Sequence, residues 1–143
     1  MTIHKKGQAH WEGDIKKGKG TISTESGALE KQPYGFNTRF EGKPGTNPEE
    51  LIGAAHSACF SMALSLMLGE AGHTPESIDT VADVSLDKVD GGFAITKVAL
   101  QSTVKLPGIE KAAFDKIIQA AKAGCPISKL LKAEITLDYQ LEN

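Results

Sequence analysis

The sequence predicts an α+β fold in which an antiparallel sheet packs on one long, buried central helix. Short Gly- and Thr-rich runs that are typical of strands occupy residues 1–45. An uncharged apolar run follows at residues 51–68, and after it come a hairpin, a second helical pattern and a final alternating strand. No internal repeat or linker interrupts this order, so we predict one domain that spans residues 1–143.

The N-terminal part is predicted to form short antiparallel strands joined by Gly-rich turns. The strands are expected at residues 8–12, 20–24 and 36–40, separated by KKGKG and by QPYG. The third run alternates, which would send its two Phe residues and Thr38 to one face and Arg39 to the other. Arg39 would then be exposed or directed at a partner.

The central helix has a clear start. Asn47 is suited to the N-cap, a proline follows it, and Glu50 stands three residues after the cap, so the helix should extend to about Gly69. Residues 51–68 have the length and the neutrality of a membrane span, but they contain His56 and several serines and lack a basic flank. We therefore interpret the run as a core helix that is buried on nearly all sides.

The second half of the chain predicts four more elements. These are a hairpin of residues 81–88 and 93–106, a helix ending at Gly124, a short helix from Pro126 to about residue 131, and a strand at residues 133–141. The glycines of Asp90-Gly91-Gly92 supply the positive φ angles of a hairpin turn. Gly124 occupies the usual C-terminal glycine position of a helix, and Pro126 is suited to the first position of the next.

The charge balance argues against nucleic acid as a partner. The chain carries 16 Lys and Arg against 18 Asp and Glu, mixed along the sequence, whereas nucleic-acid binding requires clustered basic residues. The first residues contain no apolar segment with a small-residue cleavage site, so we expect a cytoplasmic protein with no membrane partner. In a reducing compartment, two cysteines favour reactivity over a structural disulfide.

The two cysteines differ in their surroundings. Cys59 lies in the middle of the apolar helix, where desolvation would raise its pKa and leave it inert unless a cation stabilises the thiolate. No Lys or Arg occurs between Pro48 and Asp87, so Arg39, the only Arg in the chain, is the candidate cation. Cys125 falls at the N-cap of the short helix opened by Pro126, where backbone N–H groups favour a thiolate. Together the two thiols suit a sulfenic acid that condenses to a disulfide.

His56 lies three residues before Cys59, on a similar helix face, and this spacing suggests two other functions for the pair. A Cys–His pair can activate a thiol for acyl transfer, as in a hydrolase, or contribute to a metal site. A zinc site needs three or four convergent ligands, and the chain offers no second close-spaced pair. A hydrolase needs a third orienting residue, and no local motif of that kind surrounds Cys59.

Glu49 and Glu50 are candidate carboxylate partners for Arg39, although both also suit the first turn of a helix. Glu49 is ten residues before Cys59, which corresponds to a rise of about 15 Å along one helix. If both act in one site, a second subunit must contribute. A long apolar helix supports the same idea, because two such helices could bury each other in a two-fold dimer.

The segments TNPEELIGAAHSACFSMALS around Cys59 and AGCPISKLL around Cys125 closely resemble the OsmC/Ohr family of hydroperoxide reductases. The KKGKG turn, the QPYGFNTRFEG run and the LDYQLEN ending resemble the OsmC branch, which is named for osmotically induced bacterial proteins. His56 stands where the Ohr branch usually has an aromatic residue. The likeness covers essentially the whole chain.

This resemblance implies a thiol-dependent peroxidase that reduces organic hydroperoxides, and hydrogen peroxide less well, without metal, haem or flavin. It implies that Cys59 attacks the peroxide and that Cys125 then forms a disulfide with it. It also implies that Arg39 holds the thiolate and that Glu49 orients Arg39. The implied partners are a second, intertwined copy of the chain that shares each active site, and a dithiol reductant such as a lipoyl protein, thioredoxin or a small thiol.

An apolar peroxide would fit a pocket lined by residues such as Phe60 and Met62, with Arg39 supplying the one charge that the developing alkoxide needs. The main alternative is a redox sensor that uses the same cysteine pair without turnover. A stress role under high osmolarity is suggested by the family name alone.

Overall fold

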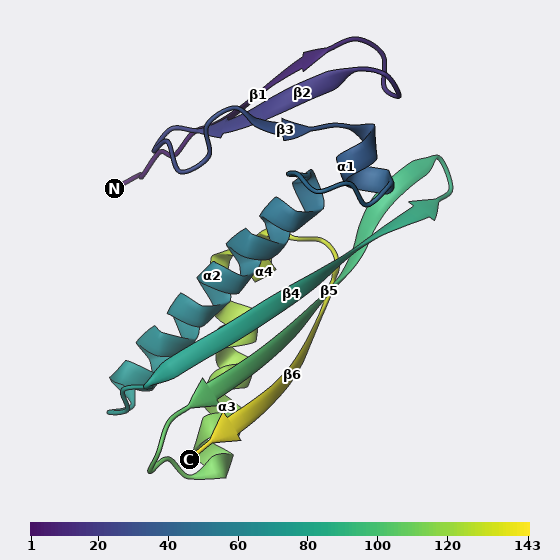
Figure 1. Cartoon of the computed structure of the whole chain (residues 1–143). Helices are drawn as coiled ribbons and strands as arrows, with labels where there is room; N and C mark the ends of the chain where they lie inside the picture. The colour runs from purple at the N-terminus through teal and green to yellow at the C-terminus, as the bar shows by residue number, and fades with distance from the viewer. The chain divides into compact units, whose positions relative to one another are not determined.

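The computed structural model describes residues 1–143, which divide into two compact units, Met1–Leu51 and Ile52–Asn143 (Figure 1). Each unit has its own sheet, and the long helix α2 (Pro48–Glu70) begins in the first unit and continues in the second. The α+β class is confirmed, but the expected single sheet is wrong because the strands form two separate three-stranded sheets.

The first unit contains an antiparallel sheet with the strand order β1-β2-β3. Its strands are β1 (Gly7–Glu12), β2 (Lys19–Thr24) and β3 (Gln32–Tyr34). The first two confirm the strands predicted at residues 8–12 and 20–24. The third occupies a segment that was predicted as a turn, and it contains Pro33 on the edge of the sheet, where the missing N–H costs no ladder hydrogen bond.

The third predicted strand is wrong: Phe36–Phe40 is the short helix α1. The Thr38 hydroxyl donates to the Gly35 carbonyl at 3.1 Å and accepts from the Gly35 N–H at 2.9 Å, which closes a turn before a strand can form. Phe36 and Phe40 then stack one turn apart with ring centroids 4.9 Å apart. The alternation in this run therefore reflects helical neighbours and not the two faces of a strand.

The predicted start of α2 is confirmed. The Glu50 N–H donates to Asn47 Oδ1 at 2.8 Å, and Pro48 occupies the first helical position. The helix has 23 residues and ends one residue beyond the predicted Gly69.

The predicted burial of α2 on nearly all sides is wrong for the chain by itself. One face is buried, through Gly53, His56, Phe60, Leu64 and Leu68. On the opposite face Met62 and Leu66 remain 75% and 63% exposed. By length and composition alone α2 qualifies as a membrane span, with a mean hydropathy of 1.7, but its packed face supports the interpretation as a core helix.

The second unit is built on a mixed sheet with the order β4-β5-β6. The strands β4 (Ser77–Val89) and β5 (Gly92–Lys105) form the long predicted hairpin, and Gly91 at the turn has φ +87°. The strand β6 (Glu134–Glu142) lies parallel to β5. All the other strand pairs are antiparallel, so the prediction of a largely antiparallel sheet is confirmed. A parallel neighbour requires a crossover, which α3 (Lys111–Gly124) and α4 (Pro126–Leu130) provide.

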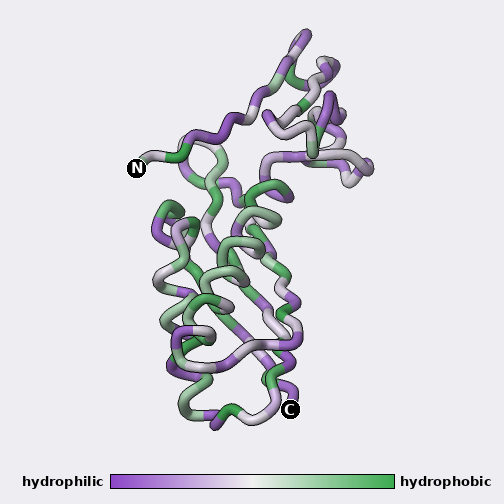
Figure 2. Tube along the Cα trace, turned by 90° about the vertical axis from the view of Figure 1, so that its left-hand side faces the viewer, coloured by the Kyte–Doolittle hydropathy of each residue, from purple (hydrophilic) through white to green (hydrophobic).

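The hydrophobic core of the second unit joins the sheet to α2 and α3 (Figure 1). Its largest members include Phe60, Leu64 and Leu68 of α2, Leu100 of β5, and Phe114 and Ile118 of α3, all between 0% and 1% exposed. Figure 2 shows the corresponding hydrophobic stretches along the helices and strands of this unit. This core fixes which face of α2 is turned inward, and therefore the direction in which its functional side chains project.

We predict opposite effects of alanine at the two glycines of α2 that differ in their surroundings. A Cβ at Gly53 would lie 3.1 Å from the carbonyl oxygen of Ala82, whereas a Cβ at Gly69 would meet nothing within 4 Å. Gly69→Ala should stabilise the protein by up to about 1 kcal/mol through helix propensity. Gly53→Ala should destabilise it by about 1–2 kcal/mol, because the Ala82 carbonyl belongs to the backbone of β4 and cannot move aside as a flexible side chain could. Urea unfolding measures both; equal effects would contradict close packing of α2 on β4.

Candidate active site

The two cysteines lie together in the second unit. Cys59, half-buried on α2, and Cys125, completely buried after α3, are both free thiols, and Cys59 packs against the core cluster to which Cys125 belongs. Cys125 and the backbone N–H of Ile127 are the polar neighbours that influence the pKa of Cys59. The second unit thus brings together the two sequence-predicted thiols in one contact.

The electrostatic setting of Cys59 disfavours its thiolate within this unit. Burial is the largest effect and raises the pKa of Cys59, and the hydrogen bond and charge of Cys125 raise it further. The hydrogen bond from the Ile127 N–H lowers the pKa of Cys59 but does not offset the other effects. Cys59 therefore needs a positive charge from outside this contact to become a reactive thiolate, as the sequence indicated.

Cys125 is held at a junction between two helices. Its N–H donates to the Ala121 carbonyl at 3.0 Å, and its own carbonyl accepts from the Lys129 N–H at 3.1 Å, so it ends α3 and begins α4. This confirms its predicted N-cap position. The predicted glycine cap is wrong, because Gly124 belongs to α3 itself and Cys125 follows with φ −58°. Gly124 instead allows close approach to α2, since a Cβ there would lie 3.2 Å from the Met67 methyl group.

His56 is hydrogen-bonded to Ser128 and not to Cys59. Its imidazole is completely buried, and Nε2 lies 2.7 Å from the Ser128 hydroxyl of α4, while Nδ1 has no hydrogen-bond partner. Burial lowers the pKa of His56, which keeps the ring neutral at neutral pH. A Cys–His hydrolase requires the imidazole to reach the thiol, so the geometry gives this alternative no support.

Arg39 and Glu49 form a bidentate ion pair, with two hydrogen bonds, in the first unit. Arg39 Nε donates to Glu49 Oε1 at 2.7 Å, and the terminal nitrogen of Arg39 donates to Oε2 at 3.0 Å. The Arg39 guanidinium also lies 5.4 Å from the centroid of the Phe40 ring. The Glu49 side chain is only 12% exposed and Arg39 is 36% exposed, so the carboxylate fixes the guanidinium while part of it stays open to solvent.

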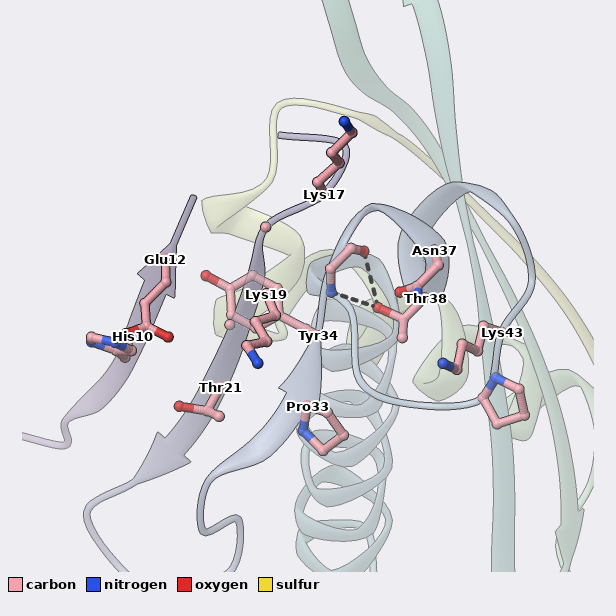
Figure 3. A pocket seen from close by; sticks show the side chains of 14 residues that line it. His10, Glu12, Lys17, Lys19, Thr21, Pro33, Tyr34, Asn37, Thr38 and Lys43 are labelled. Atoms are coloured by element: carbon pink, nitrogen blue, oxygen red, sulfur yellow. Dashed lines mark hydrogen bonds and ion pairs between the residues drawn. The ribbon is translucent and has the colours of Figure 1, made fainter. Parts of the chain in front are cut away.

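A cavity of about 570 Å³ lies in the first unit and contains neither cysteine. Figure 3 shows its lining from β1, β2, β3 and α1, with Lys19, Tyr34 and Asn37 at its wall and the hydrogen bonds between Thr38 and Gly35 at one side. The prediction that Phe60 lines the substrate pocket is wrong, because its side chain is completely buried in the core. Met62 lies on the exposed face of α2, and its place in a pocket stays a prediction.

Two groups of the site were missed by the sequence analysis, the Ile127 N–H and the Ser128 hydroxyl. The available signal was Pro126 at the first position of a helix, which leaves the next N–H groups without intrahelical acceptors. That signal identifies free donors but not the atom on α2 that they meet. No group of three or more His, Cys, Asp or Glu side chains is placed to hold a metal ion.

A pair of neighbouring free thiols, one on a helix and one at the junction of two others in an α+β fold, is the arrangement of a thiol-based redox protein. The family model described as OsmC-like protein matches residues 40–140. The chain belongs to the OsmC family.

Known proteins are similar to this chain over essentially its full length. The chain is 80% identical over 143 residues to Peroxiredoxin OsmC of Escherichia coli (strain K12), with all of both chains covered. The crystal structure of the organic hydroperoxide resistance protein OhrB of Bacillus subtilis matches with a TM-score of 0.67 at 26% identity, over 96% of this chain and 98% of that one. An OsmC-like protein of Vibrio cholerae shares the fold, with a TM-score of 0.76 at 18% identity, over 97% and 100% of the two chains.

Removing the Cys125 thiol should lower the pH at which Cys59 becomes reactive. Both the hydrogen bond and the charge of Cys125 raise the pKa of Cys59, so Cys125→Ala should shift the midpoint of Cys59 alkylation by iodoacetamide to lower pH. The measurement follows modification of the Cys59 peptide by mass spectrometry from pH 6 to pH 11. An unchanged midpoint, or one at higher pH, would contradict the contact described here.

Proposed function

We propose that this protein reduces organic hydroperoxides through a two-cysteine cycle in which Cys59 attacks the peroxide and Cys125 resolves the product. That the chain is a thiol-dependent peroxidase follows from its membership of the OsmC family and from its 80% identity to a peroxiredoxin. The contact between the two free thiols is the observation that carries the two-cysteine assignment.

The chemistry balances without a cofactor. The Cys59 thiolate attacks the distal oxygen of ROOH, the O–O bond breaks, and the alcohol leaves once the alkoxide takes up a proton, so that Cys59 becomes a sulfenic acid. Cys125 then attacks the Cys59 sulfur, the S–O bond breaks, water leaves and a disulfide forms. A dithiol reductant returns both cysteines to thiols by disulfide exchange.

In this proposal Arg39 supplies the positive charge that Cys59 lacks in its own surroundings. It stabilises the thiolate and the alkoxide that develops as the O–O bond breaks. Glu49 holds Arg39 in one orientation through two hydrogen bonds, whereas Glu50 uses its N–H to complete the helix cap. The assignment of Glu49 over Glu50 rests on this difference.

We also propose that the working unit is a homodimer whose active sites take residues from both copies. Glu49 and Cys59 are ten residues apart on α2, which is about 15 Å of helix rise. The apolar face of α2 that includes Met62 and Leu66 is exposed in the single chain, which supports its burial by a second copy. In such a dimer the two units of the chain act as one domain.

A cytoplasmic location agrees with this cycle, because both cysteines are free thiols and a reducing compartment supplies dithiols that restore them. A lipoyl protein, thioredoxin and a small dithiol all meet that chemical requirement. Organic peroxides are the proposed substrates, with hydrogen peroxide reduced less well.

Peroxide turnover with dithiothreitol tests the cycle. The wild type should consume many equivalents of cumene hydroperoxide and use hydrogen peroxide more slowly, while Cys59→Ser should lose turnover entirely because the attacking sulfur is gone. Cys125→Ser should still be oxidised at Cys59 but form no intramolecular disulfide. If the wild type stops after one equivalent, the protein is a redox sensor instead; full activity in Cys59→Ser would overturn the assignment of the nucleophile.

The neighbouring glutamates allow a matched test of the charge arrangement. Glu49→Gln should lower kcat/KM for cumene hydroperoxide by about tenfold or more, because Arg39 loses its orientation. Glu50→Gln should change it less than about twofold, since the ion pair of Arg39 is with Glu49 and the capping N–H of residue 50 is retained. Equal losses in the two variants would remove the proposed role of Glu49.

A further inference from the structure

The contact between His56 and Ser128 lies beside the two thiols, yet the cycle described above does not use it. His56 Nε2 and Ser128 Oγ are 2.7 Å apart and connect α2 to α4 across 72 residues of sequence. The imidazole is completely buried, and its Nδ1 atom has no hydrogen-bond partner. An apolar side chain would fill this position without leaving a buried polar atom unsatisfied, so the hydrogen bond has to offset that cost.

The surroundings indicate which nitrogen of His56 carries the proton. A buried N–H without an acceptor is rarer than a buried acceptor without a donor. We therefore assign the proton to Nε2, so that His56 donates to the Ser128 hydroxyl and only a lone pair is unsatisfied at Nδ1.

The short helix α4 depends on contacts with α2 for its position. It has five residues, too few for a helix to persist by itself. Apolar packing of Ile127 against the core contributes, and the hydrogen bond of Ser128 with His56 connects the helix to α2. Two further polar interactions act at its first turn, those of Cys125 and of the Ile127 N–H with Cys59. Two of these three interactions involve the sulfur of Cys59, which is the atom that reacts.

Oxidation of Cys59 changes those two contacts and leaves the third. When the Cys59 sulfur gains an oxygen, its interactions with Cys125 and with the Ile127 N–H have to rearrange. The atoms of His56 and Ser128 take no part in that reaction. A disulfide requires a sulfur–sulfur distance near 2.05 Å and a narrow range of dihedral angles, so a shift of α4 at this moment would slow its formation.

We propose that His56 is a positioning residue for disulfide formation. Through its hydrogen bond to Ser128 it holds the first turn of α4 against α2 while Cys59 is a sulfenic acid, and so keeps Cys125 next to the sulfur that it attacks. In that step Cys125 gives its electron pair to the Cys59 sulfur, the S–O bond breaks, and hydroxide leaves as water with the proton of Cys125. This inference rests on the proposed two-cysteine cycle.

Single-turnover kinetics separate this role from a general structural one. Reduced protein is mixed with cumene hydroperoxide and stopped at intervals with dimedone, which traps the sulfenic acid, or with a thiol-alkylating reagent. Mass spectrometry then gives two rates, the peroxide-dependent oxidation of Cys59 and the peroxide-independent formation of the disulfide. Ser128→Ala and His56→Leu should slow disulfide formation about fivefold or more, which corresponds to loss of one hydrogen bond, and change oxidation less than about twofold.

Two further variants sharpen the test. His56→Gln retains an N–H donor and should restore much of the rate of disulfide formation, while Lys129→Ala, at the exposed neighbour of Ser128 on α4, should leave both rates unchanged. A longer-lived sulfenic acid should also make Ser128→Ala more sensitive to conversion of Cys59 to sulfinic acid at high peroxide concentration. The double variant His56→Leu/Ser128→Ala should be no slower than either single variant, because both remove the same contact.

The outcomes distinguish this inference from the proposed function. If wild-type Cys59 is not oxidised, or no disulfide with Cys125 forms, the two-cysteine cycle itself fails. If the wild type completes the cycle but Ser128→Ala forms the disulfide at the wild-type rate, or loses both rates equally, the positioning role of His56 is wrong. Ser128→Ala removes a single oxygen atom, so it decides the question even where His56→Leu does not fold.

Discussion

Close packing of α2 on the sheet of the second unit determines the rest of the structure around the thiols. Gly53 brings α2 so near to β4 that a methyl group would lie 3.1 Å from a strand carbonyl, and Phe60 anchors the same face in the core. With the rotation of the helix fixed in this way, His56 projects inward and Cys59 lies at the edge of the buried face, where α4 meets both. The reactive position is thus a consequence of core packing.

In the proposed mechanism the nucleophile Cys59 belongs to the second unit, and the charge that activates it, on Arg39, belongs to the first. Burial makes Cys59 a poor thiolate within the second unit, while the only arginine of the chain is oriented by a carboxylate in the first. In the proposed mechanism the thiol becomes reactive only where both parts are assembled, since neither the desolvated sulfur nor the guanidinium alone makes a thiolate.

Local signals predicted much of this fold, and contacts distant in sequence account for what they did not predict. Asn47 and Pro48 predicted the start of α2, and Asp90-Gly91-Gly92 predicted the hairpin, because capping and turn chemistry act over a few residues. The strand predicted at residues 36–40 was wrong because the Thr38 hydroxyl closes a turn that alternation does not reveal. The exposed face of α2, the parallel pairing of β6 and the partner of His56 depend on tertiary packing, which no periodicity encodes.

The parallel pairing of β5 with β6 also affects how the chain reaches its native state. A hairpin such as β4–β5 closes through a short turn, but the connection from β5 to β6 is long and contains both α3 and α4. In such a non-local pairing the chain loses loop-closure entropy before any stabilising contact between the strands has formed. Pairing of β6 with β5 is therefore expected to slow refolding of the second unit relative to closure of the β4–β5 hairpin.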